Sequence, residues 1–410
     1  MLERVSCVDK FRLKCCQSYD VSQANAWVAA LIKYRIKELD LSIPVKHSTD
    51  HVLPWDLFSC RTLVVLKLGT KFLLNVPASV CLPSLKILHL DSVKFSDDDS
   101  VKRLLVGCPM LDELGMNECV GKDACVIHIC APVLTKLRYR REKKNYLWGT
   151  AEVSGYKIVI DTPALLYLEL IDYVADVYLV KNLKNIVKAY IRIAEQYDET
   201  NSKAITDLLM GISEVQCLHL YNDCTEIFDQ VKFYYVKAVQ KIDSELPIFH
   251  NLTSLVLSAG YVGWEWLSQL LAKSPCLESL VFEEGYHIEF DRDEYDEEDD
   301  KRLHWNPPQN VPSCLLLNLK VIKFVNFLGD DGDLKMVEYF LRNAEVLEKL
   351  IIQANGTVGE CFDMTAAALA IAEQQLEVTT KLLMLPRGSK TCQIEFVILR
   401  HKLGGSVSPY

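Results

Sequence analysis

Cysteine and histidine residues that could bind a metal ion lie close together at Cys119, Cys125, His128 and Cys130. Thiolate and imidazole groups are the usual ligands of structural zinc. Such sites normally include a C-x-x-C pair, however, and no pair of that spacing accompanies these four residues. If the segment VIHIC is a strand, His128 and Cys130 share one face and its isoleucines share the other, as in an ordinary half-buried strand. We therefore predict that no metal is bound.

Motifs that would indicate catalysis are also missing from the sequence. It contains no glycine-rich phosphate-binding loop and no G-x-S-x-G nucleophile motif. With nine histidines and 55 acidic residues, some catalytic-looking trio will come together by chance, so the residue inventory alone identifies no nucleophile. We predict that the chain is not an enzyme, has no catalytic residues and needs no cofactor.

The composition is that of a soluble globular protein, with 410 residues of which 50% are hydrophobic and 24% charged. The first residues lack the apolar run of a signal peptide, and no stretch approaches the roughly 20 apolar residues of a membrane helix. The 15 cysteines are an odd number, and they are better explained as free thiols of a reducing compartment than as a disulfide framework. We predict a cytoplasmic and/or nuclear protein with no membrane partner.

The net charge of −10 is concentrated in one acidic run, Glu289 to Asp300. This run has nine carboxylates and one arginine, so it carries −8 and leaves the remainder close to neutral. Like charges repel and offer no apolar surface to bury, so we predict a flexible, solvated loop over 289–300.

A leucine pattern of the form L-x-x-L-x-L recurs along almost the whole chain. The structure that it predicts must position the cysteine and histidine residues considered above. Copies that begin at residues 63, 85, 111 and 134 are 22, 26 and 23 residues apart, and others begin at 165, 215, 252, 277, 319 and 347. This spacing is typical of a leucine-rich repeat, in which each turn buries its apolar side against the next turn. Cys108 and Cys119, which flank the copy at residue 111, are then small buried groups of a scaffold.

Within each copy, the segment x-L-x-L-x predicts a strand whose alternate residues point to opposite faces. Leu88 and Leu90 are expected in the core, whereas Ile87, His89 and Asp91 face outward. The middle outward residues of successive strands should line up on the concave face of a parallel sheet. We predict that this row binds the partner, and it comprises Lys67, His89, Gly115, Arg138, Glu169, Tyr190, His219, Val256 and Val281.

The mixed character of this row favours a protein partner, because a nucleic acid would require a continuous basic stripe. The basic segment KLRYRREKK, residues 136–144, could contact phosphate or an acidic partner. It is better explained as the end of a strand followed by an exposed loop. We predict that no nucleic acid is bound.

The returning part of a turn predicts a helix in at least two copies. Val101, Leu104 and Leu105 have helical spacing, acidic residues precede them, and Gly107 and Pro109 form a stop signal. The same arrangement recurs at Leu267, Leu270 and Leu271, ahead of Ser274 and Pro275. Cys108 and Cys276 would then be small buried thiols in helix-to-strand turns. The predicted fold is an α/β leucine-rich-repeat solenoid, or horseshoe, with a parallel β-sheet.

Several longer segments resemble the plant F-box proteins that combine leucine-rich repeats with a C-terminal FBD domain. WVAALIKYRIKELDLSIP, LPWDLFSCRTLVVLKL and CLPSLKILHLDSVKF are similar to consecutive landmarks of the repeats. WNPPQNVPSCLLLNLKVIKF and LPRGSKTCQIEF are similar to the FBD region. The resemblance implies a repeat domain over 1–310, an FBD-like domain over 311–398 that continues the repeats, and a tail over 399–410.

The resemblance also implies a role in an SCF-type E3 ubiquitin ligase, as the portion that recognises a protein substrate. Family members usually begin with an F-box that binds a Skp adaptor, and no such element is recognisable before Phe11. We therefore expect Skp adaptor and cullin as partners only if an F-box is supplied. The alternative is a stand-alone leucine-rich-repeat scaffold, or a decoy, that binds partners without recruiting a ligase.

Overall fold

The computed structural model describes residues 8–14, 21–43, 51–69, 72–121, 126–141, 156–172, 175–193, 201–221, 246–258, 264–283, 310–327, 329, 331–355 and 376–399. The chain divides into two compact units, Met1–Val215 and Gln216–Tyr410. The acidic run 289–300, Cys125 and residues 400–410 of the predicted tail lie outside the described residues. Where the structure describes the chain, no helix combines the length and the apolar character needed to cross a membrane.

The first unit is built on a ladder of short parallel strands, each paired with the next in register. Each strand carries one copy of the leucine pattern or a variant of it. The strands are, in order across the sheet, β1 (Lys10–Lys14), β2 (Glu38–Ser42), β4 (Val65–Gly69), β6 (Ile87–Asp91), β8 (Glu113–Asn117), β11 (Lys136–Arg141), β13 (Tyr167–Asp172) and β15 (Lys188–Ile193).

The leucines of the pattern form the core of this unit, as predicted. Leu88 and Leu90 are almost fully buried at 0% and 2% exposure, and both lie opposite leucines of β4. Strand alternation requires the residues between them to lie on the other face. Burying one apolar face of every strand against the returning segments holds successive turns together.

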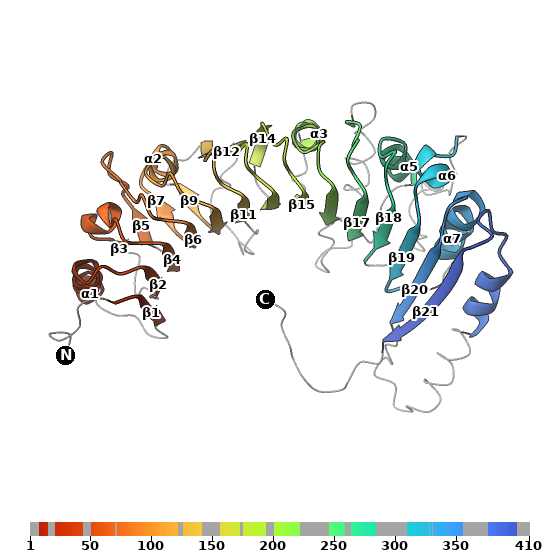
Figure 1. Cartoon of the computed structure of the whole chain (residues 1–410), viewed down its shortest axis with the longest axis horizontal. Helices are drawn as coiled ribbons and strands as arrows, with labels where there is room; N and C mark the ends of the chain where they lie inside the picture. Colours follow the sequence, from red (N-terminus) through yellow and green to blue (C-terminus); the bar gives the residue numbers. More distant parts are fainter. Residues whose placement is uncertain are drawn as a thin grey trace, which may run out of the picture. The chain divides into compact units, whose positions relative to one another are not determined.

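Helices and two smaller sheets form the returning side of the first unit, opposite the ladder strands (Figure 1). One sheet has the order β3-β5-β7-β9 and the other β10-β12-β14, and α2 and α3 adjoin β10 and β14. The elements are α1 (Val21–Lys33), β3 (His51–Val52), η1 (Trp55–Ser59), β5 (Phe72–Leu74), β7 (Lys94–Phe95), α2 (Ser100–Val106), β9 (Val120–Gly121), β10 (Val126–Cys130), β12 (Tyr156–Asp161), β14 (Ala175–Lys181) and α3 (Asn201–Gly211).

Helix α2 confirms the helix predicted from Val101, Leu104 and Leu105, and it ends immediately before Gly107. A Cβ atom at Gly107 would lie 2.8 Å from the backbone oxygen of Val80, so the close approach of the two turns requires glycine.

The acidic start of α2 has a specific partner. Asp97 accepts hydrogen bonds from the backbone N–H of Asp99 and from Nη2 of Arg103. The bond from Arg103 lowers the pKa of Asp97 to about 2. Asp97 therefore links the N-terminal end of the helix to Arg103 in its last turn.

Side-chain hydrogen bonds between turns reinforce the ladder just before each strand. The Thr62 hydroxyl donates to the backbone oxygen of Ile36 at 2.9 Å, and the Ser84 hydroxyl donates to that of Arg61 at 2.7 Å. Both bonds connect one turn of the chain to the preceding turn. They satisfy carbonyl groups that the parallel ladder itself leaves without a partner.

A buried carboxylate joins the ladder to the β10-β12-β14 sheet. Asp172, at the end of β13, has no exposed surface. It accepts hydrogen bonds from the hydroxyl groups of Tyr156 and Tyr178, the latter at 2.6 Å, and from the backbone N–H of Ala175 at 3.0 Å. The Tyr139 hydroxyl lies 3.4 Å from that of Tyr156. We call these four side chains, Asp172, Tyr139, Tyr156 and Tyr178, the tyrosine–aspartate cluster.

The second unit is also a ladder of parallel strands, and its core contains phenylalanines at some of the leucine positions of the pattern. Its parallel sheet has the order β16-β17-β18-β19-β20-β21, in register throughout. Phe282 and Phe324 stack in its core with ring centroids 4.8 Å apart. The elements are β16 (Cys217–Tyr221), β17 (Ser254–Ser258), α5 (Trp264–Ala272), β18 (Ser279–Phe282), α6 (Ser313–Leu317), β19 (Val321–Val325), α7 (Asp331–Asn343), β20 (Lys349–Asn355) and β21 (Gln393–Leu399).

The second predicted helix is confirmed as α5, but the prediction for Cys276 is wrong. Cys108 is buried, whereas Cys276 is exposed. In the turns G-C-P-M-L and K-S-P-C-L, the buried position before proline is held by Cys108 in one and by Ser274 in the other. Cys276 therefore occupies the exposed position of Met110.

Candidate functional site

The nine residues predicted to bind a partner lie on adjacent strands, in two sets. Six of them face one another across consecutive strands of the first unit, at Lys67, His89, Gly115, Arg138, Glu169 and Tyr190. The other three follow one another in the same way across β16, β17 and β18 of the second unit, at His219, Val256 and Val281. We call the outward face of the first unit's ladder, β1 to β15, the sheet face.

Two of the nine side chains are less accessible than their positions suggest. Glu169 and Val256 are each only 6% exposed. Glu169 lies beneath the arginines that contact it, and Val256 is a short side chain between His219 and Val281 on the neighbouring strands. Neither offers much surface of its own.

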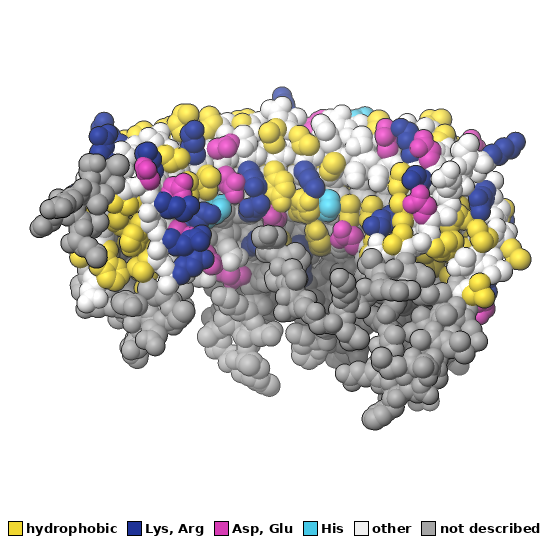
Figure 2. Space-filling model, turned by 60° about the horizontal axis from the view of Figure 1, so that its bottom comes forward, with side chains coloured by type: hydrophobic (Ala, Val, Ile, Leu, Met, Phe, Trp, Pro, Cys, Tyr) yellow, Lys and Arg dark blue, Asp and Glu magenta, His cyan; other side chains and the backbone are white. Residues whose placement is uncertain are grey.

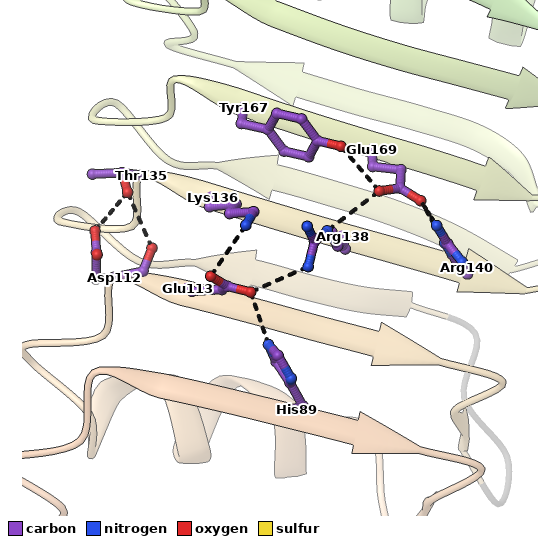
Figure 3. Close-up of polar contacts among 9 residues, drawn as sticks. All are labelled: His89, Asp112, Glu113, Thr135, Lys136, Arg138, Arg140, Tyr167 and Glu169. Atoms are coloured by element: carbon purple, nitrogen blue, oxygen red, sulfur yellow. Dashed lines mark hydrogen bonds and ion pairs between the residues drawn. The ribbon is translucent and has the colours of Figure 1, made fainter. Parts of the chain in front are cut away.

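The sheet face carries closely interleaved charges of both signs (Figure 2). Glu113 of β8 is the first centre of this network (Figure 3). Its Oε1 lies 2.9 Å from Nε2 of His89 and 3.3 Å from Nη1 of Arg138, and its Oε2 lies 3.3 Å from Nζ of Lys136. One carboxylate thus links β6, β8 and β11.

Glu169 of β13 is the second centre, as Figure 3 also shows. Its Oε1 accepts hydrogen bonds from Arg140, and its Oε2 accepts one from the Tyr167 hydroxyl at 3.1 Å and lies 3.4 Å from Nε of Arg138. Arg138 therefore bridges the two carboxylates, Glu113 and Glu169.

Two tyrosine rings extend this network toward the last strand of the ladder. The rings of Tyr167 and Tyr190 lie 5.5 Å apart between centroids. Lys136 and Arg138 lie over the Tyr167 ring at 5.7 and 5.8 Å, and Lys188 lies over the Tyr190 ring at 4.8 Å. Cation–π contacts at such distances hold the long basic side chains against the sheet.

Gly115 is part of this arrangement because it makes room for a neighbour. A Cβ atom at Gly115 would lie 3.0 Å from Cδ2 of His89, closer than most such contacts. A side chain at this position would displace the imidazole ring by a few tenths of an ångström, and glycine lets the ring lie over β8 without this shift. Gly115 thereby sets the position of the ring beside Glu113.

Burial determines the protonation state of His89. It lowers the pKa of His89 below the ordinary value of 6.5, and the hydrogen bond that His89 donates to Glu113 acts in the opposite direction. Burial alone would raise the pKa of Glu113, but hydrogen bonds from His89 and Lys136 outweigh it and lower that pKa. At neutral pH the ring is therefore neutral, and its Nε2–H donates to an ionised carboxylate.

This lowered pKa predicts a pH dependence of stability. The unfolded chain takes up a proton on His89 near pH 6.5, before the folded protein does, so acid should destabilise the fold from that pH downward. His89→Gln should reduce the loss of unfolding free energy between neutral and mildly acidic pH, as measured by urea unfolding. The exposed His250 provides a matched control as His250→Gln. An equal effect of the two substitutions would contradict the prediction.

The candidate zinc ligands do not form a site in the described residues. Cys119 is buried, its thiol points to the backbone oxygens of Leu90 and Asn117, and burial raises its pKa to about 12. A thiol must lose its proton to bind a metal. His128 and Cys130 share the half-buried face of β10, as the pattern predicted. No group of three or more possible metal ligands occurs in the part of the chain that the structure describes.

The predicted partner-binding residues omit some residues of both rows, and they omit the flanking rows, of which the pattern had assigned only Ile87 and Asp91 to the outward face. In register, the row of the first unit also includes Arg12 and Asp40, and that of the second continues through Lys323, Ile351 and Glu395. Glu113, Lys136 and Tyr167 belong to the row two residues earlier on each strand. That row corresponds to the x position directly before the second leucine of each copy, so the pattern already contained the signal for it.

The fold and this face define a leucine-rich-repeat protein with a C-terminal FBD region. A family model described as FBD-associated F-box protein At5g56370, LRR repeats, matches residues 24–171, and a model described as FBD matches residues 306–352. The chain belongs to the plant F-box/FBD/LRR-repeat protein family. The predicted fold class and the predicted family resemblance are both confirmed.

Relatives from Arabidopsis thaliana match most of the chain. F-box/FBD/LRR-repeat protein At4g26340 is 30% identical over 364 residues, which cover 85% of this chain and 75% of the relative. Putative F-box/LRR-repeat protein At5g15620 is 30% identical over 410 residues, covering 95% of this chain and 84% of the relative. FBD-associated F-box protein At4g10400 is 28% identical, covering 96% and 83%.

Proposed function

We propose that this protein recognises a protein substrate for an SCF-type E3 ubiquitin ligase, and that it does so through the sheet face. The observation that carries the proposal is the register of the ladder. It lines up the polar and aromatic side chains of β6 to β15 as one continuous surface outside the core. The printed names of the relatives support the association with F-box proteins.

The proposed role is that of a non-catalytic adaptor located in the cytoplasm and/or nucleus. Skp adaptor and cullin would join through an F-box, and the repeats would hold the substrate. The second candidate, a stand-alone scaffold or decoy, differs only in recruiting no ligase. Family membership favours the first candidate.

Capture of a Skp adaptor tests whether a ligase can be recruited only through an F-box. The chain of 410 residues and a fusion that carries the F-box of a relative at its N-terminus are compared in a pull-down with purified adaptor. We expect only the fusion to bind, because the described residues form repeat strands and the segments between them rather than an F-box. Light scattering on both proteins provides the control for aggregation.

Equal capture by the chain alone would contradict the expected requirement for an F-box, because an adaptor-binding surface would then lie within the repeats. Ubiquitylation separates the two candidates. If the folded fusion supports ubiquitylation of no protein that the sheet face binds, the scaffold or decoy is favoured.

A further inference from the structure

The sheet face is basic although the protein as a whole is acidic. Three outward positions on each of the eight ladder strands make up this face. They include five acidic residues, Glu38, Asp40, Asp91, Glu113 and Glu169. They include nine basic residues, Lys10, Arg12, Lys14, Lys67, Lys136, Arg138, Arg140, Lys188 and Arg192. The chain carries −10 overall, so the positive excess is a local property of this face.

The two signs of charge also lie at different depths. In the pair Arg12–Asp40 the side chains are 58% and 17% exposed, and in the pair Arg138–Glu169 they are 38% and 8% exposed. The pairs Lys10–Glu38 and Lys136–Glu113 have the same order. In these four pairs the carboxylate lies beneath its cation and holds it in place, so a partner meets chiefly the cations there.

Several of these cations keep the capacity to bind an anion. Arg138 reaches its two carboxylates at the long distances of 3.3 and 3.4 Å, which leaves most of its five N–H donors available. Lys188 contacts the Tyr190 ring and has no carboxylate partner among the described residues. We call Lys136, Arg138, Arg140 and Lys188, with the Tyr167 and Tyr190 rings between them, the basic patch.

The basic patch has the size of a short peptide motif. It lies on three neighbouring strands, β11, β13 and β15, which at about 4.8 Å per strand measure roughly 10 Å from first to last. An extended peptide covers that distance with about three to four residues. Glu113 and Glu169 interrupt the positive charge, and this disfavours the evenly charged backbone of a nucleic acid.

We propose that the basic patch binds an acidic peptide segment of the protein partner, with an aromatic or aliphatic side chain against the two tyrosine rings. This inference rests on the proposed function, because it names the chemistry of the partner that the sheet face would bind. Its occupant is an extended segment with two or more carboxylates within about four residues.

Fluorescence anisotropy tests the proposal on the full chain at low ionic strength. The probe is a labelled peptide of about eight residues, rich in glutamate and aspartate with one central tyrosine. The variant is Lys188→Glu, which breaks no described ion pair. Its matched control is Lys102→Glu on the exposed side of α2, which changes the net charge equally.

We expect the probe to bind the wild type, and Lys188→Glu to weaken binding by about fivefold to tenfold, since an attraction becomes a repulsion. Lys102→Glu should change it by less than about twofold, and added salt should weaken it. Circular dichroism of each variant checks the fold. Should Lys188→Glu fail to fold, Lys188→Gln gives the same test with a smaller expected loss.

Four results would overturn the proposal. They are no binding of the probe to the wild type, equal losses in the Lys188 and Lys102 variants, equal binding of a probe in which amides replace the carboxylates, and tighter Lys188-dependent binding of an oligonucleotide with the same charge. Adaptor capture by the F-box fusion is independent of these results. If the fusion binds the adaptor and the peptide does not bind, only the proposal of an acidic partner segment is wrong. If the peptide binds and no ligase is recruited, the ligase assignment is wrong.

Discussion

Replacing Asp172 by alanine is expected to lower the free energy of unfolding by roughly 3 to 5 kcal/mol, because it leaves several buried donors without an acceptor. The donors are the hydroxyl groups of Tyr156 and Tyr178 and the backbone N–H of Ala175. Each unsatisfied buried donor costs about 1 to 3 kcal/mol, and entry of water would offset part of the total. Urea unfolding followed by circular dichroism measures the effect.

Two further substitutions separate this mechanism from a general loss of charge. Asp91 ends β6 and is exposed, so Asp91→Ala should cost no more than about 1 kcal/mol. Burial raises the pKa of Asp172, despite opposing hydrogen bonds from Tyr156 and Tyr178. Stability should therefore fall as pH rises from 3.8 through that raised pKa, and Asp172→Asn should remove this dependence. Equal costs for the two alanine variants would contradict the role of the tyrosine–aspartate cluster.

Leu88→Ala is the second substitution with a large expected effect, at about 2 to 5 kcal/mol of unfolding free energy. Leu88 is 0% exposed, and it lies between Leu66 of β4 and Leu114 of β8 in the ladder. Its removal leaves a cavity that these turns cannot close without shifting strands that are fixed by backbone hydrogen bonds. The midpoint and slope of urea unfolding give the measurement.

The adjacent Ile87 is the matched control, because it belongs to the same strand but faces outward and is only half-buried. Ile87→Ala should cost clearly less than Leu88→Ala. If both variants unfold at the wild-type midpoint, the assignment of Leu88 to the core is wrong.

The spacing of leucines was enough to predict the ladder and the row of outward residues. A strand has a period of two residues, so one buried leucine determines which of its neighbours face outward. His89 and Arg138 could therefore be assigned to the same face from the sequence alone, and they are linked there through Glu113. Val215, Leu218 and Leu220 show the limit of this reasoning, since Leu220 is only half-buried.

The returning side could not be predicted in the same way. Strands β3, β7 and β9 have two residues each, which is too short to show any period. The tyrosine–aspartate cluster unites Tyr139, Tyr156, Asp172 and Tyr178 from different turns, and no common spacing relates them. The burial of Glu169 depends on Arg138 and Arg140, which belong to another strand. Such features arise only once the turns stack.

The sharing of two carboxylates among neighbouring strands affects how this face can acquire new specificity. Arg138 contacts both Glu113 and Glu169, so a change at any of the three alters the electrostatic environment of the other two. Substitutions in direct contact do not contribute additively. A new partner preference on these strands would therefore arise through sets of compensating substitutions, whereas Lys188, which has no carboxylate partner among the described residues, could be exchanged by itself. A library that randomises one position at a time would sample single exchanges and would miss the sets of compensating substitutions.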